Sequence, residues 1–311
     1  MEKQKISIII PCYSEEEAIP ICYNALIKEV ILRLSEVNFE IIFIDDGSKD
    51  ETLKVIKNLS EKDSRIKYLS FSRNFGKEAA IYAGLNHATG DYVAIMDVDL
   101  QDPPELLILM YETLLTDEYD CVATRRTTRQ GEPFIRSFFA KAFYRFINKI
   151  SQTDIVEGAR DFRLMKRPMV EAILKVGEYN RFSKGIFEWV GFNTKWIEFE
   201  NVERVAGITK WSFWELFLYS LEGIISFSTA PLAIASVTGF IFFVLSFLAI
   251  VVIIIREMMW HGSAFGWPSL VCIIFFIGGI QLFCIGILGQ YMARTYLETK
   301  KRPIYIVKEH N

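Results

Sequence analysis

Two carboxylates lie two residues apart, directly after a short apolar run, in Asp97-Val98-Asp99-Leu100-Gln101. In extended backbone such residues point the same way, so Asp97 and Asp99 can converge on one site. Together with the amide oxygen of Gln101 they suit a hard divalent cation such as Mg²⁺ or Mn²⁺, which prefers oxygen ligands. Such a cation usually shares its shell with substrate phosphates. The alternative is a solvated acidic turn that binds nothing.

Polar residues also follow three earlier apolar runs. These stretches are Pro11-Cys12-Tyr13-Ser14-Glu15, Asp45-Asp46-Gly47-Ser48 and Ser72-Arg73-Asn74-Phe75-Gly76-Lys77. Asp45 or Asp46 could accept hydrogen bonds from a nucleobase or a ribose hydroxyl, and Gly47 allows a tight turn. An ordinary turn and helix N-cap is the alternative for this stretch. Four polar strand ends on one edge of a sheet predict a pocket.

The elements that must position these residues alternate between strand and helix. Strands are expected at 6–10, 39–44, 66–71, 92–96 and 121–124, and helices at 16–35, 50–60, 77–88 and 104–115. Apolar strands that alternate with helices predict an α/β fold with a parallel sheet covered on both faces. Ligands of such sheets bind outside the carboxyl ends of the strands.

Two later segments, 230–255 and 267–293, contain no charged residue over 26 and 27 positions. Roughly 20 apolar residues span a bilayer core, so each segment predicts a transmembrane helix. A buried helical hairpin in a soluble protein is the alternative. The linker 256–266 is expected outside. The tail 294–311 carries Arg294, Lys300, Lys301 and Arg302, which predicts that the tail and the domain 1–210 are cytoplasmic, at the plasma membrane.

Two further segments have the composition of helices at a membrane surface. Residues 211–229 are rich in aromatic side chains and predict an interfacial amphipathic helix. Residues 134–150 are basic and aromatic, and this helix could equally pack on the core of the domain. The aromatic face of 211–227 and the two spans also offer surfaces on which a second copy of the chain could pack.

Charge and cysteine content exclude other classes of protein. The net charge is −3, so there is no global electrostatic case for nucleic acid binding. The five cysteines lack the spacing of metal ligands, which indicates buried thiols in a reducing compartment. The sequence shows no signal-peptide pattern.

In order and spacing, the four polar stretches resemble family 2 glycosyltransferases. The resemblance is strongest to the branch that acts on polyprenyl phosphates, which includes dolichol-phosphate mannose synthase-like and bactoprenol glucosyltransferase-like enzymes. It covers nearly the whole chain and includes the two C-terminal spans. It implies a GT-A-type nucleotide-sugar-binding domain with a mainly parallel sheet, followed by interfacial helices and two transmembrane helices.

The resemblance also implies roles for individual residues. The nucleotide pocket would be lined by Pro11, Tyr13, Glu15, Asp46, Arg73 and Lys77. The metal and the donor diphosphate would be held by Asp97, Asp99 and Gln101. Asp161 matches the position of the catalytic base, and Arg204 and Lys210 match a basic segment that closes over the phosphates. The sequence departs from the family pattern at Ser14, where Asn is usual, at Thr209, which replaces a frequent Ser, and at Ala159-Arg160, where many members have a Gly.

An acceptor site can be argued from charge alone. Four arginines follow the fifth strand, namely Arg125, Arg126, Arg129 and Arg136. A lipid phosphate needs bidentate cationic partners, which Arg supplies better than Lys. Binding of anionic head groups, or plain solvation, is the alternative. Because a phosphate acceptor is already ionised, Asp161 could orient it or take a residual proton. Otherwise Asp161 would form a structural ion pair with Arg160 or Arg163.

The expected function is therefore an inverting, metal-dependent enzyme that moves one sugar from a nucleotide sugar to a polyprenyl phosphate such as undecaprenyl phosphate, for cell-envelope glycans. UDP-glucose or UDP-N-acetylglucosamine is the expected donor, with GDP-mannose as the alternative. A processive or oligosaccharide-extending family 2 synthase is a second hypothesis. However, the chain lacks the Gln-x-x-Arg-Trp signature of processive members. A non-catalytic scaffold would not need Asp97, Asp99, Gln101 and Asp161.

Overall fold

The computed structural model describes residues 3–126, 156, 158–199, 230–260 and 266–311. The chain divides into two units. The first consists of Met1–Ser220 and Arg302–Asn311, and the second of Leu221–Lys301. The first unit carries the sheet and the second carries two long helices, and we describe each unit by itself.

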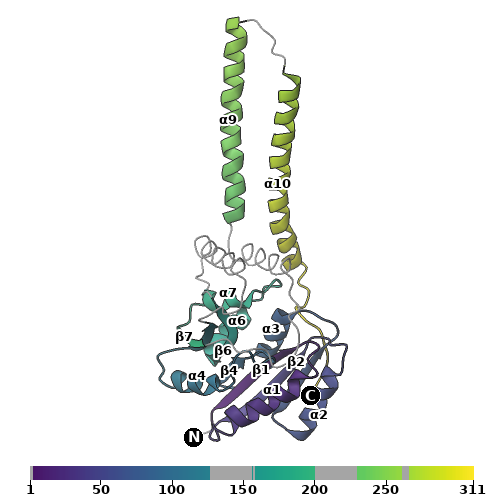
Figure 1. The fold of residues 1–311 in the computed structure, drawn as a ribbon, viewed down its shortest axis with the longest axis vertical. Coiled ribbons are helices and arrows are strands. Elements are labelled where there is room, and N and C mark those ends of the chain that lie inside the picture. The colour runs from purple at the N-terminus through teal and green to yellow at the C-terminus, as the bar shows by residue number, and fades with distance from the viewer. Residues whose placement is uncertain (1–2, 127–155, 157, 200–229, 261–265) are drawn as a thin grey trace. The chain divides into compact units, whose positions relative to one another are not determined.

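The first unit is built around one eight-stranded sheet with the order β7-β5-β6-β4-β1-β2-β3-β8. Its central strands are β1 (Lys5–Cys12), β2 (Asn38–Asp45), β3 (Ile66–Phe71) and β4 (Tyr92–Ile95). β1 pairs in parallel with β2 and β4, and β2 pairs in parallel with β3. The helices between these strands are α1 (Ala18–Leu26), continued by the π-helical turn η1 (Ile27–Ile31), α2 (Thr52–Lys62), α3 (Lys77–His87) and α4 (Leu106–Leu114). The predicted α/β fold with a mainly parallel sheet is confirmed (Figure 1).

The central strands read as continuous apolar runs because helices cover both faces of the sheet. In β1, Ile8, Ile9 and Ile10 are all fully buried, with no alternation between buried and exposed positions. Helix α3 packs very closely on this strand at Gly84. A Cβ atom at that position would lie 2.2 Å from Cγ2 of Ile9, so any larger residue would push the helix away from the sheet.

Antiparallel strands complete the sheet on both sides of this parallel centre. β6 (Ala159–Lys166) lies between β4 and β5 (Cys121–Arg126) and is antiparallel to both. β7 (Thr194–Phe199) pairs in parallel with β5. Two further helices are α6 (Arg167–Lys175) and α7 (Ser183–Trp189). The sequence pattern did not predict β6, β7 or the last strand, β8.

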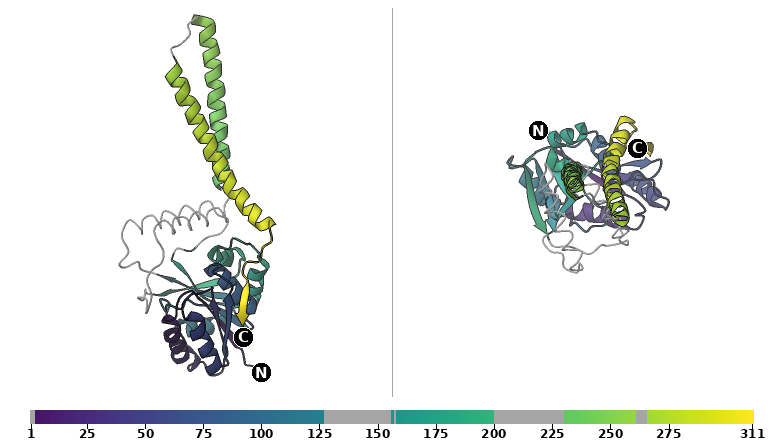
Figure 2. Two further views of the ribbon diagram at one scale, coloured as in Figure 1. Left: turned by 90° about the vertical axis from the view of Figure 1, so that its right-hand side faces the viewer. Right: turned by 90° about the horizontal axis from the view of Figure 1, so that it is seen from above.

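The C-terminal residues contain a strand that the sequence pattern did not predict. We expected 294–311 to be a cytoplasmic tail, and Arg302–Asn311 belongs to the first unit. Its strand β8 (Val307–His310) pairs antiparallel with β3 and is the yellow arrow of Figure 2. The sequence did not indicate this strand because its four residues alternate half-buried and exposed positions at the edge of the sheet, so no apolar run marks it.

The second unit consists of α9 (Ala230–Trp260) and α10 (Trp267–Thr299), which extend beyond the predicted segments 230–255 and 267–293. The two helices touch through Phe242 and Phe276, whose ring centroids are 5.5 Å apart. Among the described residues, Ile273–Thr299 is long and apolar enough to cross a membrane, and Pro231–Phe242 is a shorter apolar stretch. The helices predicted at 134–150 and 211–229 lie outside the described residues.

Candidate active site

The polar stretches meet at the carboxyl edge of the sheet. Because β1, β2, β3 and β4 are parallel neighbours, the residues that follow them emerge at one edge. β1 connects onward to β2 on one side and pairs with β4 on the other, so the strand order reverses beside it. A crevice at such a reversal is the usual ligand site of α/β sheets.

A lysine joins two of the predicted site carboxylates. Nζ of Lys77, the first residue of α3, lies 2.6 Å from Oδ1 of Asp97 and 2.6 Å from Oδ2 of Asp161. Asp97 follows β4 and Asp161 lies in β6, and their side chains are 23% and 17% exposed. The structure therefore brings together a predicted metal ligand, the predicted base and a predicted donor-binding residue. The ion-pair partner of Asp161 is Lys77, and not Arg160 or Arg163 as in the alternative we considered.

The charge of Asp161 is set by burial and by its cationic neighbours. Burial alone would raise its pKa, but the charges of Lys77 and Lys184 outweigh it and hold the pKa of Asp161 well below its usual range. Lys184, near the start of α7, also donates a hydrogen bond to the carbonyl oxygen of Ala159 at 3.0 Å. The guanidinium of Arg163 is buried and lies 3.7 Å from the ring centroid of Phe187. These basic groups favour anionic ligands, and sequence reasoning did not assign a role to Lys184.

The loop after β4 has a strained backbone and a buried anchor. Leu100 adopts φ +53°, a left-handed conformation that costs a non-glycine residue about 1–2 kcal/mol. Asp102 is 2% exposed, and its Oδ1 accepts a hydrogen bond from Nε of Arg160 at 3.1 Å. The amide oxygen of Gln101 accepts hydrogen bonds from Arg126 at 3.2 Å and from Arg160 at 3.4 Å. The sequence did not predict the pair of Asp102 and Arg160. The one signal was the departure from the family pattern noted at Ala159-Arg160.

This loop suits a divalent cation only in part. Asp97 already contacts a cation, the ammonium group of Lys77. Asp99 lies two residues after Asp97 on the same loop. Gln101, in contrast, uses its amide oxygen to hold two guanidinium groups. Among the described residues, no group of three or more His, Cys, Asp or Glu side chains could hold a metal by itself. A cation at Asp97 and Asp99 would therefore depend on further oxygens, such as those of a diphosphate.

Asp45 and Asp46 hold loops together. Both oxygens of Asp46 accept backbone hydrogen bonds, from Phe75 at 2.6 Å and Gly76 at 2.8 Å, and burial raises the pKa of this carboxyl to about 6. Asp45 accepts hydrogen bonds from the backbone N–H of Ser48 at 3.0 Å and from Oγ of Ser70 at 2.7 Å. Both residues are almost fully buried. Their direct role is thus to fix the loops of the predicted nucleotide pocket.

Gly47 and Ser14 show why these loops need particular residues. Gly47 has φ +67°, and a Cβ atom there would lie 2.4 Å from the carbonyl carbon of Arg73. Ser14 has φ +54°, and its backbone N–H donates to Oγ of Ser48 at 2.9 Å. Asn is enriched in the left-handed region, so an Asn at this position would fit the same backbone.

The remaining predicted nucleotide residues lie on the same edge. Pro11 is near the end of β1, and Tyr13 is 38% exposed just beyond it. The backbone N–H of Glu15 donates to Oγ1 of Thr52 at 2.8 Å. The guanidinium of Arg73 lies 4.0 Å from the ring centroid of Phe75.

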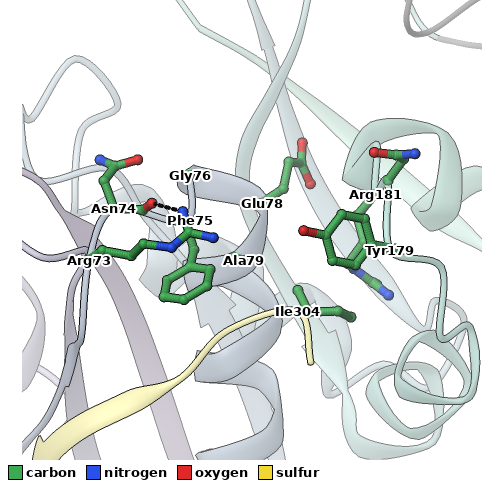
Figure 3. Close-up of a pocket in the computed structure, with 10 residues that line it drawn as sticks. Arg73, Asn74, Phe75, Gly76, Glu78, Ala79, Tyr179, Arg181 and Ile304 are labelled. Atoms are coloured by element: carbon green, nitrogen blue, oxygen red, sulfur yellow. Dashed lines mark hydrogen bonds between the residues drawn. The ribbon is translucent and has the colours of Figure 1, made fainter. Parts of the chain in front are cut away.

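A cavity of about 330 Å³ adjoins the loop that carries Arg73. It is lined by Arg73, Asn74, Phe75, Gly76, Glu78, Ala79, Tyr179, Asn180, Arg181 and Ile304. Figure 3 shows Arg73 and Asn74 on one side of it and Tyr179 and Arg181 on the other. The carboxylate of Glu78 accepts hydrogen bonds from the backbone N–H and the hydroxyl of Ser183, so α3 is tied to the start of α7.

Two of the predicted acceptor-site arginines lie at the end of β5. Arg126 reaches Gln101, as described above, and Arg125 forms an ion pair with Glu198 of β7. Arg126 therefore lies at the carboxylate loop, whereas Arg125 is engaged on the neighbouring strand. Arg129, Arg136, Arg204 and Lys210 lie outside the described residues.

The chain is similar to one family model, to several proteins of known sequence and to solved structures. Residues 7–174 match the family model described as Glycosyl transferase family 2. The chain is 45% identical to the putative glycosyltransferase CsbB of Bacillus subtilis, over 100% of this chain and 93% of that protein. It is also 45% identical to the prophage bactoprenol glucosyl transferase homolog of Escherichia coli, over 98% of each chain. One solved structure is a mannosyltransferase from Pyrobaculum calidifontis in complex with GDP-Man and Mn²⁺, which is 15% identical to this chain. The two structures match over 94% of this chain and 88% of that protein, with a TM-score of 0.47. The match to the family model and the extent of identity to these relatives establish that the chain is a glycosyltransferase and belongs to glycosyl transferase family 2.

Proposed function

We propose that this glycosyltransferase moves a single sugar, with inversion, from a nucleotide sugar to a polyprenyl phosphate. The observation that carries the proposal is the Asp97–Lys77–Asp161 ion-pair chain at the carboxyl edge of the sheet. In this chain Lys77 joins Asp161, the residue that matches the family's base, to Asp97, a carboxylate suited to a cation that would bind the donor's diphosphate. Relatives of nearly the same length are named bactoprenol glucosyl transferases, which supports a lipid phosphate as the acceptor.

The donor end of the reaction releases a nucleoside diphosphate. Its developing negative charge requires cations, and a Mg²⁺ or Mn²⁺ ion held by Asp97 and Asp99 would supply charge neutralisation there. In our proposal Gln101 orients Arg126 and Arg160 toward the same region. Lys77 contributes a further positive charge next to Asp97. Pro11, Tyr13, Glu15 and Arg73 line the nucleotide side of the pocket.

The acceptor end of the reaction takes place at Asp161. A phosphate acceptor is already an anion, so it needs cationic partners more than a strong base. Lys184 and Lys77 flank Asp161 and can hold the phosphate near it, together with the arginines after β5. In this arrangement ionised Asp161 orients the acceptor and takes any residual proton. The segment that contains Arg204 and Lys210 would close over the phosphates.

We further propose that α9 and α10 both cross the membrane and that the first unit is cytoplasmic. The return of Arg302–Asn311 to the first unit supports this, because a chain that leaves and rejoins one domain crosses a membrane an even number of times. The apolar side chains on the surface of the two helices also support it, with Phe240 67% and Phe275 77% exposed. Residues 211–229 would lie along the interface.

The test is transfer by the purified full-length chain in lipid nanodiscs that contain undecaprenyl phosphate. UDP-glucose, UDP-N-acetylglucosamine and GDP-mannose are supplied separately with Mg²⁺ or Mn²⁺, and lipid products are identified by mass spectrometry. We expect one sugar per lipid, from UDP-glucose or UDP-N-acetylglucosamine, and loss of the product in Asp99→Ala. A product with several sugars would favour the processive alternative. Absence of any lipid-linked sugar with all three donors would refute the proposal.

A further inference from the structure

The C-terminal segment is firmly docked on β3. Its strand β8 pairs Ser70 with Glu309, and Nζ of Lys57 lies 2.6 Å from the Glu309 carboxylate. Farther along, the side chain of Asn311 accepts a hydrogen bond from the backbone N–H of Tyr68 at 2.7 Å. These contacts anchor the segment along β3 and to α2.

At the carboxyl edge, the same segment reaches the loop 72–77. The ring of Tyr305 stacks on Phe71, with centroids 5.1 Å apart and planes 17° apart, and Phe71 in turn meets Phe75 edge-on at 5.8 Å. The backbone N–H of Ser72 donates to the carbonyl oxygen of Ile306 at 3.0 Å. Tyr305 also touches the ring of Tyr82 in α3, with centroids 6.4 Å apart. In Figure 3 the yellow C-terminal ribbon passes next to Phe75.

The loop 72–77 is thus held from two sides. Asp46 binds the N–H groups of Phe75 and Gly76 from the sheet side, and Tyr305 with Ile306 supports the loop from the outer side. The loop carries Arg73, and it ends at Lys77, whose ammonium bridges Asp97 and Asp161. A shift of this loop would therefore move Arg73 on the nucleotide side of the proposed site and Lys77 at the two carboxylates.

We propose that Tyr305 is a positioning residue for the nucleotide-sugar donor, acting through Phe71 on the loop 72–77. This rests on the proposed function, in which that loop binds the donor. Tyr305 follows the end of α10 at Thr299 by only six residues, so the segment that connects the membrane helix to the sheet is also part of the support of the donor site.

The test compares Tyr305→Ala and Tyr305→Leu with Tyr305→Phe in the full-length chain. Phe keeps the stacked ring, whereas Leu keeps apolar bulk but loses the stack. Glu309→Gln is the matched control, because it removes an ion pair that joins the same segment to Lys57 of α2 and leaves the contacts of Tyr305 in place. The measurements are hydrogen exchange at the amides of Phe75 and Gly76, affinity for UDP and GDP by calorimetry, and donor KM and kcat.

We expect Tyr305→Ala and Tyr305→Leu to speed exchange at both amides and to raise donor KM about tenfold, the equivalent of losing one aromatic contact, with kcat within about twofold of wild type. Tyr305→Phe and Glu309→Gln should keep the wild-type values. An unchanged donor KM in Tyr305→Ala and Tyr305→Leu, whether or not exchange rises, would overturn the proposal. If the wild-type chain transfers no sugar, the proposed function fails, and the positioning role is then decided by nucleotide affinity: a loss of about tenfold supports it, and no change overturns it.

Discussion

Nζ of Lys77 lies 2.6 Å from Oδ2 of Asp161, although the two residues are 84 positions apart in the chain. The contact joins the first turn of α3 to the inserted strand β6. The same ammonium contacts Asp97, so one cation organises the two carboxylates on which the proposed reaction depends.

Replacement of Lys77 tests this organisation. We expect Lys77→Gln to lower kcat/KM about 100-fold, since loss of one preorganised charged group at a reacting centre typically costs two to three orders of magnitude. Lys166→Gln is the control, because Lys166 pairs with Asp117, whose side chain is 88% exposed, in an ion pair of no consequence for the site. Equal activity of the two variants would contradict the role of Lys77. The measurement is initial-rate kinetics with the donor identified in the transfer assay.

The contact between the loops at Gly47 and Arg73 predicts a steric effect. Gly47→Ala should lower the unfolding temperature and raise donor KM, because Ala must adopt φ +67° and its Cβ would overlap the backbone of Arg73. Gly177→Ala is the matched control, since no atom lies within 4 Å of a Cβ there and its φ is not in the left-handed region. Thermal unfolding of the detergent-solubilised chain distinguishes the two. A Gly47→Ala variant as stable as Gly177→Ala would show that the loops can separate at little cost.

The left-handed backbone of Ser14 predicts opposite effects of two substitutions. Ser14→Asn should be neutral or slightly stabilising, whereas Ser14→Val should destabilise the chain by about 1–2 kcal/mol, because a β-branched residue is poorly tolerated at positive φ. The backbone hydrogen bond to Ser48 does not depend on the side chain at position 14 and is retained in both. Urea unfolding monitored by tryptophan fluorescence gives the difference. Similar stability of the two variants would count against the left-handed conformation.

A buried glutamate at the opposite edge of the sheet predicts acid sensitivity. Glu40 is 2% exposed and accepts hydrogen bonds from Oγ of Ser7 at 2.6 Å and from the backbone N–H of Thr89 at 3.0 Å. Burial would raise its pKa, but Lys67, Ser7 and Thr89 together lower the pKa to about 2 from an ordinary value of 4.5. Because the folded-state pKa is the lower one, the stabilisation is fully present above pH 4.5 and is lost as the pH falls toward 2.

Glu40→Gln should therefore be less stable than wild type at neutral pH, and the difference should shrink as the pH falls below 4.5. Unfolding temperatures measured from neutral to acidic pH give this comparison. A difference that stays constant over the whole range would show that the charge of Glu40 contributes nothing. Kinetic parameters at neutral pH should change little, since Glu40 lies at the edge of the sheet opposite the site.

Much of the site could be predicted because it depends on local pattern. Apolar runs that end in Asp97, Asp45 or Arg73 mark parallel strands, and parallel strands deliver their carboxyl ends to one edge. The individual partners could not be predicted in this way. Asp46, for example, was expected to line the nucleotide pocket, and nothing in the pattern indicated that it accepts hydrogen bonds from the backbone of Phe75 and Gly76.

By itself, the sequence determined the alternation of strands and helices, the edge of the sheet where chemistry is possible, and the two long apolar segments. Each of these depends on the pattern of apolar residues within a short stretch of the chain. The tertiary structure alone decided that β6 enters the sheet between β4 and β5 and carries Asp161 to Lys77, and that Tyr305 returns to support the loop 72–77. These contacts join residues that are distant along the chain. They depend on strand pairing and side-chain packing across the sheet, which leave no periodic signal in the sequence.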